Sequence, residues 1–253
     1  MLEKTTLNHF NRISSTWENK GWVRSEKFNS TIRDFIRSSE RKVNLHKKKY
    51  RSSVYFGIGT GALFKNFPRY SVAGIDEAAH MLGKCSEGII QILSKVEELP
   101  FLMDNQFNLA FSRNLLKHCP EPLLAIESMY RKTRPGGIAV VAESVVINPD
   151  DREIPTRLVR MTDVSHPAFL AQDETVNLFY KAGFKHVEYK IVPYRSAWLQ
   201  KWLLAEQASK EMAQEILDMY KHAPQGFLQR HHVVIDGRDI ISTVPWLLLC
   251  AYK

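Results

Sequence analysis

The chain has 253 residues, enough for one large domain, and its 44% hydrophobic and 25% charged residues are ordinary for a globular protein. No apolar run approaches the roughly 20 residues that cross a bilayer, and residues 1–6 lack the features of a signal peptide. Cys85, Cys119 and Cys250 are scattered and odd in number, which indicates neither a disulfide framework nor a zinc site. A reducing cytoplasm is therefore the expected compartment.

The net charge of +8 raises the question of a polyanionic partner. The densest basic run, residues 41–51, precedes the first expected strand and lacks interleaved aromatic residues. We favour a solvated surface loop for this run, and keep an RNA or lipid contact as the alternative.

The predicted elements follow in chain order. Residues 1–40 favour helices, because apolar residues recur at three- or four-residue spacing. From residue 52 strands and helices alternate, which predicts an α/β fold with a seven-stranded, mostly parallel sheet and helices on both faces. The expected strands are 52–56, 70–75, 89–93, 107–112, 137–146, 185–192 and 242–252. The expected helices are 61–66, 77–85, 115–118, 122–133 and 173–182.

The most informative motif follows the first strand, where glycines occupy positions 57, 59 and 61. Such glycines allow a tight turn and a close approach of a ligand to the backbone, and a following helix would offer unpaired N–H groups. The spacing fits the dinucleotide fingerprint, with Ala62 third, and also the first motif of S-adenosylmethionine (SAM) enzymes. Asp76, after the next strand, suits the ribose hydroxyls of either ligand. A purely structural turn is the remaining interpretation.

Two segments, 147–172 and 193–240, fall outside the alternation. In the second, Trp198 and Trp202 share one face of an expected helix, and Pro224 ends a later one. We expect a helical lid over the ligand at about 194–232, inserted between the last two strands. A peripheral cap that only buries core is the alternative.

Four further motifs resemble those of class I SAM-dependent methyltransferases, in the branch that includes ubiquinone/menaquinone-biosynthesis and other small-molecule methyltransferases. They are residues 96–101, residues 104–110, residues 112–122 and the turn at 134–137. Residues 10–18 are similar to the N-terminal cap helix of that family. The resemblance covers residues 8–145 well, and its ordered motifs favour SAM over a dinucleotide.

The resemblance implies SAM as the cofactor and assigns residues to its parts. The glycine motif would pack against the amino acid and ribose, Asp76 would accept from the ribose hydroxyls, and residues 96–97 would lie beside the adenine. Residues 112–114 would meet the amino-acid end. The expected cofactor-binding residues are Gly57, Gly59, Thr60, Gly61, Asp76, Val96, Glu97, Arg113 and Asn114.

Two positions depart from the family pattern. Tyr55 stands where an acid usually precedes the first glycine by two residues, and Lys95 stands where an acid usually reads the adenine amino group. Each lost acceptor to a charged group would cost about 1.5–3 kcal/mol of binding. Either Glu97 or Glu98 substitutes, or the SAM pose differs, or the chain performs another SAM reaction or only binds; substitution is favoured.

Methyl transfer needs mainly alignment and exclusion of water, with a base only where the acceptor loses a proton. His118, Glu143 and Tyr194 follow expected strands and are the candidate catalytic residues, although a structural role is favoured for each one alone. Four tryptophans could form a wall for a planar acceptor, or equally pack in a core: Trp17, Trp22, Trp198 and Trp202. No metal site is expected, because the pair His231-His232 lacks a clear ligand partner.

Together these features predict an N-terminal helical cap at residues 1–50 and a SAM-binding domain at 51–253. The predicted function is methylation of a small-molecule acceptor, either a secondary metabolite or a quinone-type compound. Three alternatives stay open: a non-methylating SAM enzyme such as a cyclase, a non-catalytic SAM-fold binding protein, and the less favoured RNA or protein methyltransferase.

Overall fold

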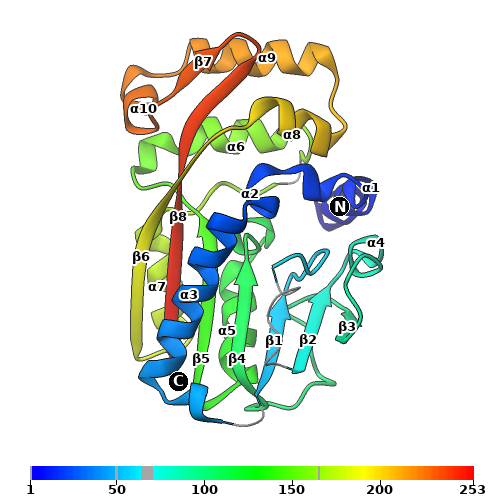
Figure 1. Cartoon of the computed structure of the whole chain (residues 1–253), viewed down its shortest axis with the longest axis vertical. Helices are drawn as coiled ribbons and strands as arrows, with labels where there is room; N and C mark the ends of the chain where they lie inside the picture. The colour runs from blue at the N-terminus through cyan, green and yellow to red at the C-terminus, as the bar shows by residue number, and fades with distance from the viewer. Residues whose placement is uncertain (1, 49–50, 64–70, 165) are drawn as a thin grey trace.

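The computed structural model describes residues 2–48, 51–63, 71–164 and 166–253, and a single twisted sheet runs through them (Figure 1). The strands lie in the order β3-β2-β1-β4-β5-β8-β6, with β7 paired to β8. Strands β1 to β5 are parallel to one another, while β8 is antiparallel to β5, β6 and β7. Their bounds are β1 Ser52–Phe56, β2 Ser71–Asp76, β3 Ile89–Leu93, β4 Phe107–Arg113, β5 Thr133–Ser144, β6 His186–Ala197, β7 Val234–Asp236 and β8 Asp239–Tyr252.

The expected α/β class and the seven main strands are confirmed. The short strand β7 was not expected. It forms a hairpin with β8, in which Asp236 pairs with Asp239 and Gly237 adopts a φ of 57°. An Asp-Gly pair between apolar residues is a hairpin signal, so the sequence contained the information that predicts this strand.

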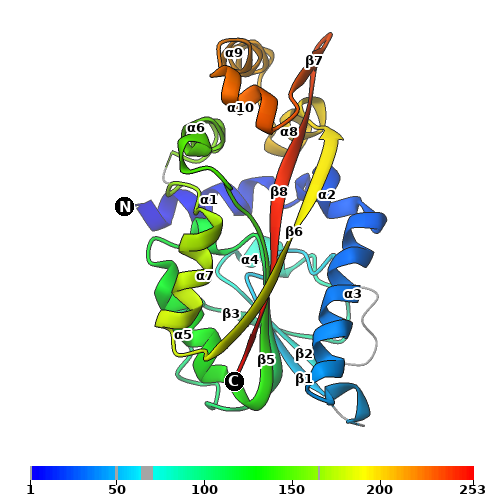
Figure 2. The same ribbon diagram turned by 90° about the vertical axis from the view of Figure 1, so that its left-hand side faces the viewer.

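Both faces of the sheet are covered, as Figure 2 shows. Alternate residues of each strand enter two cores: Val54 and Phe56 face α5 (Pro122–Lys132) and α7 (Gln172–Lys181), whereas Tyr55 faces α3 (Glu26–Lys42). A strand buried on both faces reads as a continuous apolar run. This explains why the central strands were recognisable in the sequence.

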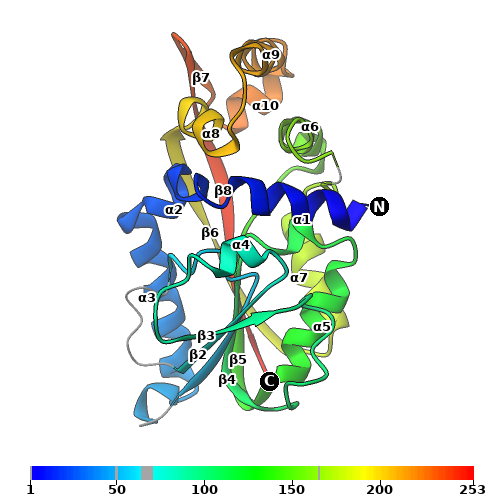
Figure 3. The same cartoon turned by 90° about the vertical axis from the view of Figure 1, so that its right-hand side faces the viewer.

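The N-terminal residues are helical, as expected. They form α1 (Leu2–Ile13), the 3-10 turn η1 (Trp17–Asn19), α2 (Gly21–Arg24) and α3, whose N-cap Ser25 accepts from the Phe28 N–H at 3.3 Å. Figure 3 shows α1 lying across the end of the sheet rather than along its face. The division of the chain into domains at residue 50 stays a prediction.

A second helical unit, distinct from the N-terminal helices and called the helical cap below, stands beyond the carboxyl ends of the central strands (Figures 1 and 3). It contains η5 (Pro149–Arg152), α6 (Glu153–Arg160), α8 (Leu199–Glu206), α9 (Lys210–Lys221) and α10 (Gln225–Arg230), with the outer parts of β6 and β8 and the short β7. The cap has its own apolar core, to which Leu199, Ile216 and Phe227 belong. The helical insertion between the last two main strands is therefore confirmed, although residues 194–197 belong to β6.

The expected helix 61–66 is wrong over its first three residues. Gly61 has a φ of 70°, outside the right-handed helical region, and residues 61–63 form no helix. Residues 64–66, like residue 70 of the second expected strand, lie outside the described residues. Two other expected helices are short, namely α4 (Ala79–Leu82) and the 3-10 turn η4 (Leu116–His118).

No helix among the described residues combines the length and the hydropathy that a membrane crossing requires.

The core under α7 offers a direct test of the packing. Phe179 is fully buried, so Phe179→Ala should lower the free energy of unfolding by about 3–5 kcal/mol. Its neighbour Tyr180 is 49% exposed, and Tyr180→Ala should change stability by about 0.5 kcal/mol. Urea unfolding of both variants measures the difference, and equal losses would contradict the assigned burial.

Candidate functional site

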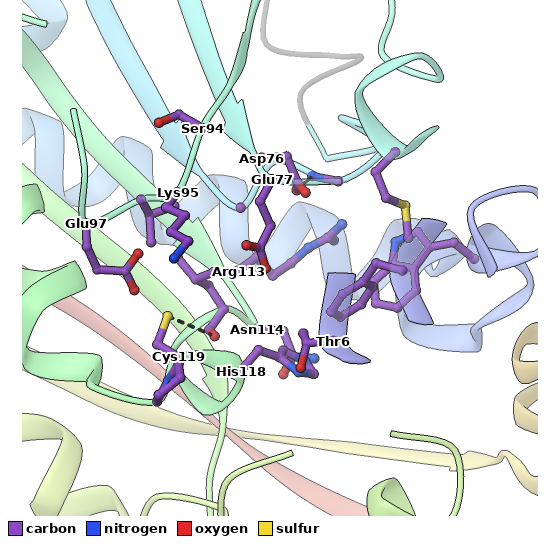
Figure 4. Close-up of a pocket in the computed structure, with 18 residues that line it drawn as sticks. Thr6, Asp76, Glu77, Ser94, Lys95, Glu97, Arg113, Asn114, His118 and Cys119 are labelled. Carbon is purple, nitrogen blue, oxygen red and sulfur yellow. Dashed lines mark hydrogen bonds between the residues drawn. The ribbon is translucent and has the colours of Figure 1, made fainter. Parts of the chain in front are cut away.

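The glycine motif forms the floor of a pocket at the carboxyl ends of β1, β2 and β4 (Figure 4). Gly57 and Gly59 line the pocket and have φ values of 64° and 56°. A Cβ on Gly57 would lie 2.7 Å from a methyl carbon of Leu115, so this position admits only glycine on steric grounds as well. Residues 57–63 form a turn, so within the described part of the loop it is turn backbone that borders the pocket.

Asp76 ends β2 and joins the two neighbouring loops. One carboxylate oxygen accepts from the Gly59 N–H at 2.8 Å, and the other accepts from the Ala78 N–H at 2.9 Å. Burial raises the pKa of Asp76, while these backbone donors oppose the shift. The Glu77 N–H is a third backbone donor to this carboxylate, and the Asp76 side chain lines the pocket.

The residues after β3 form one wall of the pocket. Val96 and Glu97 both line it, as does Lys95. The Lys95 ammonium lies 4.0 Å from the carboxylate of Glu98, whose side chain is 72% exposed and does not line the pocket. Of the two acids that were expected to compensate for Lys95, only Glu97 therefore faces the ligand space.

Arg113 and Asn114 line the pocket at the end of β4. Asn114 adopts a left-handed conformation with a φ of 58°, and its N–H donates to the Ala142 carbonyl at 2.8 Å. Its side-chain oxygen accepts from the Ser144 hydroxyl at 2.8 Å. Asn114 is thus held from both its backbone and its side chain, which fixes the wall beside the glycine motif.

A layer of buried polar groups lies behind this wall. Glu143 is 2% exposed, and one of its oxygens accepts from the N–H groups of Leu115 and Leu116 at 2.7 and 3.2 Å. Burial raises the pKa of Glu143 and lowers that of the nearby Lys117, whose ammonium donates to Ser144 at 3.1 Å. Glu143 does not line the pocket, and its contacts are those of a residue that holds the loop after β4 in place.

His118 lines the pocket and contacts two aromatic rings. Its ring centre lies 5.0 Å from that of Phe10 and 4.8 Å from that of His166. Burial lowers the pKa of His118 well below its ordinary value, and lowers that of His166 to about 3, so both imidazoles are neutral at pH 7. The neutral imidazole has a free lone pair, but the lowered pKa makes His118 a weaker base than an exposed histidine.

Helix α1 and η1 cover the pocket. Thr6, Phe10 and Trp17 line it, and the rings of Phe10 and Trp17 meet edge to face at 5.7 Å between centres. The Thr6 hydroxyl donates to the Asp163 carboxylate at 3.3 Å, which joins α1 to the segment after α6.

The helical cap contacts α1 and the residues around η1, and these in turn cover the pocket. Arg12 donates to the Glu206 carbonyl at 2.8 Å, Thr16 donates to the Ala205 carbonyl at 2.7 Å, and the Lys20 ammonium lies 2.6 Å from the Glu206 carboxylate. No described residue of the stretch 194–232 lines the pocket. The inserted helices therefore hold the cover rather than form it.

Several expected site residues lie elsewhere. Tyr194 packs against Phe28 with ring centres 5.0 Å apart, and Trp22 packs between Trp17 and Trp246. Trp198 and Trp202 belong to the core of the cap, where the Trp198 ring lies 5.5 Å from that of Tyr220 in α9. Thr60 is buried beside the pocket, and neither it nor Gly61 lines the described cavity.

Sequence reasoning missed other lining residues. Phe10 was recognised only as an apolar helix position, and Thr6, Glu77 and Ser94 carried no signal. Met81 also lines the pocket. His166, which supports His118, comes from a segment 48 positions further along the chain, and only the fold brings them together.

The strand order, the glycine motif and the acid after β2 define the class of protein: a SAM-binding fold of the class I methyltransferase type. In agreement, the family described as "Methyltransferase domain" matches residues 54–141. Residues 54–141 are thus similar to a methyltransferase domain, and the described chain has the fold of solved methyltransferases.

Three comparisons illustrate this relationship. A 2-methyl-6-phytyl-1,4-hydroquinone methyltransferase 2 of Oryza sativa subsp. japonica is 30% identical over 157 residues, which cover 58% of this chain and 42% of the relative. A putative methyltransferase of Bacillus halodurans has a TM-score of 0.72 at 18% identity, covering 85% of this chain and 98% of that one. A phosphoethanolamine N-methyltransferase 2 of Haemonchus contortus, solved with SAM, has a TM-score of 0.53 at 14% identity, covering 93% and 60%.

The fold alone does not determine the reaction. The [4+2]-cyclase SpnF also has this fold, with a TM-score of 0.52 at 18% identity, covering 86% of this chain and 82% of that one. The chain spans less than half the length of the curated relative from rice.

The buried histidines predict a pH dependence of stability. Unfolded His166 would bind a proton below about pH 6.5, whereas the folded residue binds one only near pH 3, so stability falls as the pH drops through this window. His166→Gln should flatten this dependence by up to about 1.4 kcal/mol per pH unit. Urea unfolding at several pH values between 6.5 and 4.5 tests this, with the exposed His46→Gln as the control. An unchanged slope in His166→Gln would contradict the assignment.

Proposed function

We propose that this protein transfers the methyl group of SAM to a small-molecule acceptor, either a quinone-type compound or a secondary metabolite. The observation that carries the proposal is the position of Asp76. A half-buried carboxylate, already oriented by Gly59 and Ala78, lines the pocket beside the glycine motif, within the residues that match a methyltransferase domain.

SAM would extend along the carboxyl ends of the strands. Asp76 would accept hydrogen bonds from the ribose hydroxyls, Val96 and Glu97 would lie at the adenine, and Met81 would pack against its face. Gly57, Arg113 and Asn114 would meet the amino-acid end. The supporting observation is that all of these residues line one continuous pocket. The finer assignment remains our proposal.

The reaction itself requires alignment and a dry site. The sulfonium is a strong electrophile, and the protein must hold the acceptor in line with the methyl group. Phe10 and Trp17 on the cover would exclude water from the reacting atoms.

Two observations support the proposed acceptor class: the position of His118 and the name of the rice relative. The rice relative is named for a hydroquinone, and a phenolic hydroxyl must lose its proton on methylation at oxygen or on activation of the ring. The neutral His118, which lines the pocket beside Phe10, is the proposed base.

Nucleic acid is a less favoured acceptor, because part of the basic run at 41–51 is engaged within the protein. Arg51 is buried and its guanidinium lies 3.3 Å from the carboxylate of Glu40, while Lys42 pairs with Glu188. The proposed compartment is the cytoplasm, whose reducing conditions suit the free Cys85, Cys119 and Cys250.

Methyl transfer is tested by incubating the protein with methyl-labelled SAM and pools of phenols and quinols. Labelled product together with S-adenosylhomocysteine is expected. Binding of SAM without labelled product from any pool would count against methyl transfer, and consumption of acceptor without S-adenosylhomocysteine would indicate a cyclase-type reaction.

Removal of the Asp76 charge should weaken cofactor binding. Asp76→Asn keeps the size of the side chain but loses a charged acceptor, so the affinity for SAM should fall roughly ten- to hundredfold. Calorimetric titration measures this. Asp34→Asn on α3, whose side chain is 69% exposed, is the matched control and should bind as the unmodified protein does. Equal affinity in Asp76→Asn would remove Asp76 from the site.

Substitution of His118 should affect turnover rather than cofactor binding. With an acceptor found by labelling, His118→Gln should lower kcat by roughly 10²–10⁴-fold, as loss of a general base does, and leave the Kd for SAM within about twofold. The exposed His222→Gln on α9 is the control. A His118→Gln variant with an unchanged kcat would show that no proton transfer passes through His118.

A further inference from the structure

The two edge strands of the sheet differ in how they are protected. Strand β6, at one edge, carries Glu188, Lys190, Pro193 and Arg195. Charges and prolines of this kind keep an edge strand from pairing with another chain. At the opposite edge, which Figure 3 views, β3 pairs within the described chain with β2, and its five residues include neither a charge nor a proline. The sheet is therefore guarded at β6 and unguarded at β3.

The backbone hydrogen bonds show which groups of β3 point outward. The N–H of Ser94, directly after β3, donates to the Asp76 carbonyl of β2 at 3.1 Å. Because the direction of the hydrogen-bonding groups alternates along a strand, residues 90 and 92 face β2 in the same way. The N–H and C=O groups that point away from the sheet are therefore those of Ile89, Gln91 and Leu93.

The side chains of β3 include exposed apolar groups on both faces of the strand. Ile90 is 59% exposed and Leu93 is 62% exposed, whereas β4 in the middle of the sheet is buried throughout. Side chains alternate between the faces, so Ile90 shares a face with the half-buried Ile92, and Leu93 shares the other with the half-buried Ile89. A strand added beside β3 would cover both exposed side chains.

The charges that flank β3 suit a second copy of the same strand. The exposed Glu87 lies two residues before the strand, and Lys95 lies two residues after it. When two copies of β3 run antiparallel about a two-fold axis at Gln91, Glu87 of each copy faces Lys95 of the other. The same register places Ile89 opposite Leu93 and Ile90 opposite Ile92. Charge and apolar pairing are thus satisfied by one arrangement.

We propose that the protein forms a two-fold homodimer in which the β3 strands of two copies pair antiparallel and join the two sheets. The inference goes beyond the proposed function and does not depend on it. An axis between two residues would set outward groups against inward ones, and an axis at residue 90 or 92 would lose the pairing of Glu87 with Lys95. The axis at Gln91 keeps both, and it pairs all the residues of β3.

The dimer would also reach the candidate pocket, because Lys95 lines it. Within its own copy the Lys95 ammonium lies 4.0 Å from the carboxylate of the exposed Glu98, and exposed pairs of this kind contribute little. Glu87 of the second copy would bring a further negative charge to this wall. The charge that Lys95 adds, where the resembled family has an acid, would thus be balanced across the interface.

Sedimentation of the purified protein over a roughly hundredfold range of concentration tests the dimer. The contact is short, so a reversible dimer that depends on concentration is expected. Gln91→Pro removes an outward N–H without removing a bond to β2, and proline is tolerated at such an edge position. This variant should sediment as a monomer, while the matched Gln91→Ala, which keeps the N–H, should dimerise as the unmodified protein does.

Charge reversal tests the register independently of the backbone. Glu87→Lys and Lys95→Glu, each alone, set like charges opposite one another at both ends of the paired strands, so each should weaken dimerisation roughly tenfold. An equal mixture of the two variants restores both opposite-charge pairs, and it should dimerise about as well as the unmodified protein. Glu215→Lys on α9, an exposed position with the same change of charge, is the control.

Three results would overturn the inference. A monomer at every concentration would remove the dimer. A dimer that Gln91→Pro leaves intact would place the interface on another surface. A mixture of Glu87→Lys and Lys95→Glu that associates no better than either variant alone would contradict the register. If Gln91→Pro does not fold, the charge variants, which lie outside the strand, still decide.

Discussion

The contact between Asp76 and the Gly59 N–H is the interaction on which the candidate site depends. It joins the loop after β1 to the end of β2, and the Ala78 N–H holds the second oxygen of the same carboxylate. The glycines permit this contact, because Gly57 and Gly59 adopt left-handed conformations that turn the chain sharply at the edge of the sheet. The Asp76 side chain lines the pocket. The loop and the acid thus form a preorganised acceptor that spends no energy on reorientation when a ribose binds.

The second constraint is electrostatic. Glu143, Lys117, His118 and Arg113 lie at or after the carboxyl ends of β4 and β5, and burial shifts the pKa of each in the direction that favours its neutral form. Glu143 is engaged by backbone donors of the loop after β4, and Lys117 by Ser144. Their neutral partners hold them in position, while His118 and Arg113 line the space for ligands. In this account His118 and Arg113 contact the cofactor and the acceptor, and Glu143 and Lys117 behind them fix the geometry of the site.

The sequence predicted the sheet well, because strands buried on both faces leave continuous apolar runs, and the glycine motif with Asp76 located the pocket. It failed where local patterns compete with tertiary packing. Gly61 begins no helix, since its backbone is left-handed. Trp198 and Trp202 have the spacing of a lid face, but they pack in the core of the cap. His166 and Thr6 reach the site from distant parts of the chain, which no local pattern reveals. The two departures from the family pattern differ in kind: Tyr55 contacts Arg113, whereas at Lys95 the nearby Glu97 faces the pocket.

The most direct test of the central claim is a crystal structure of the protein with S-adenosylhomocysteine. The account predicts the ribose hydroxyls within hydrogen-bond distance of the Asp76 carboxylate, the adenine beside Val96 and Glu97, and the amino-acid end beside Gly57, Arg113 and Asn114. A ligand bound elsewhere, or bound in this pocket with its ribose turned away from Asp76, would contradict it.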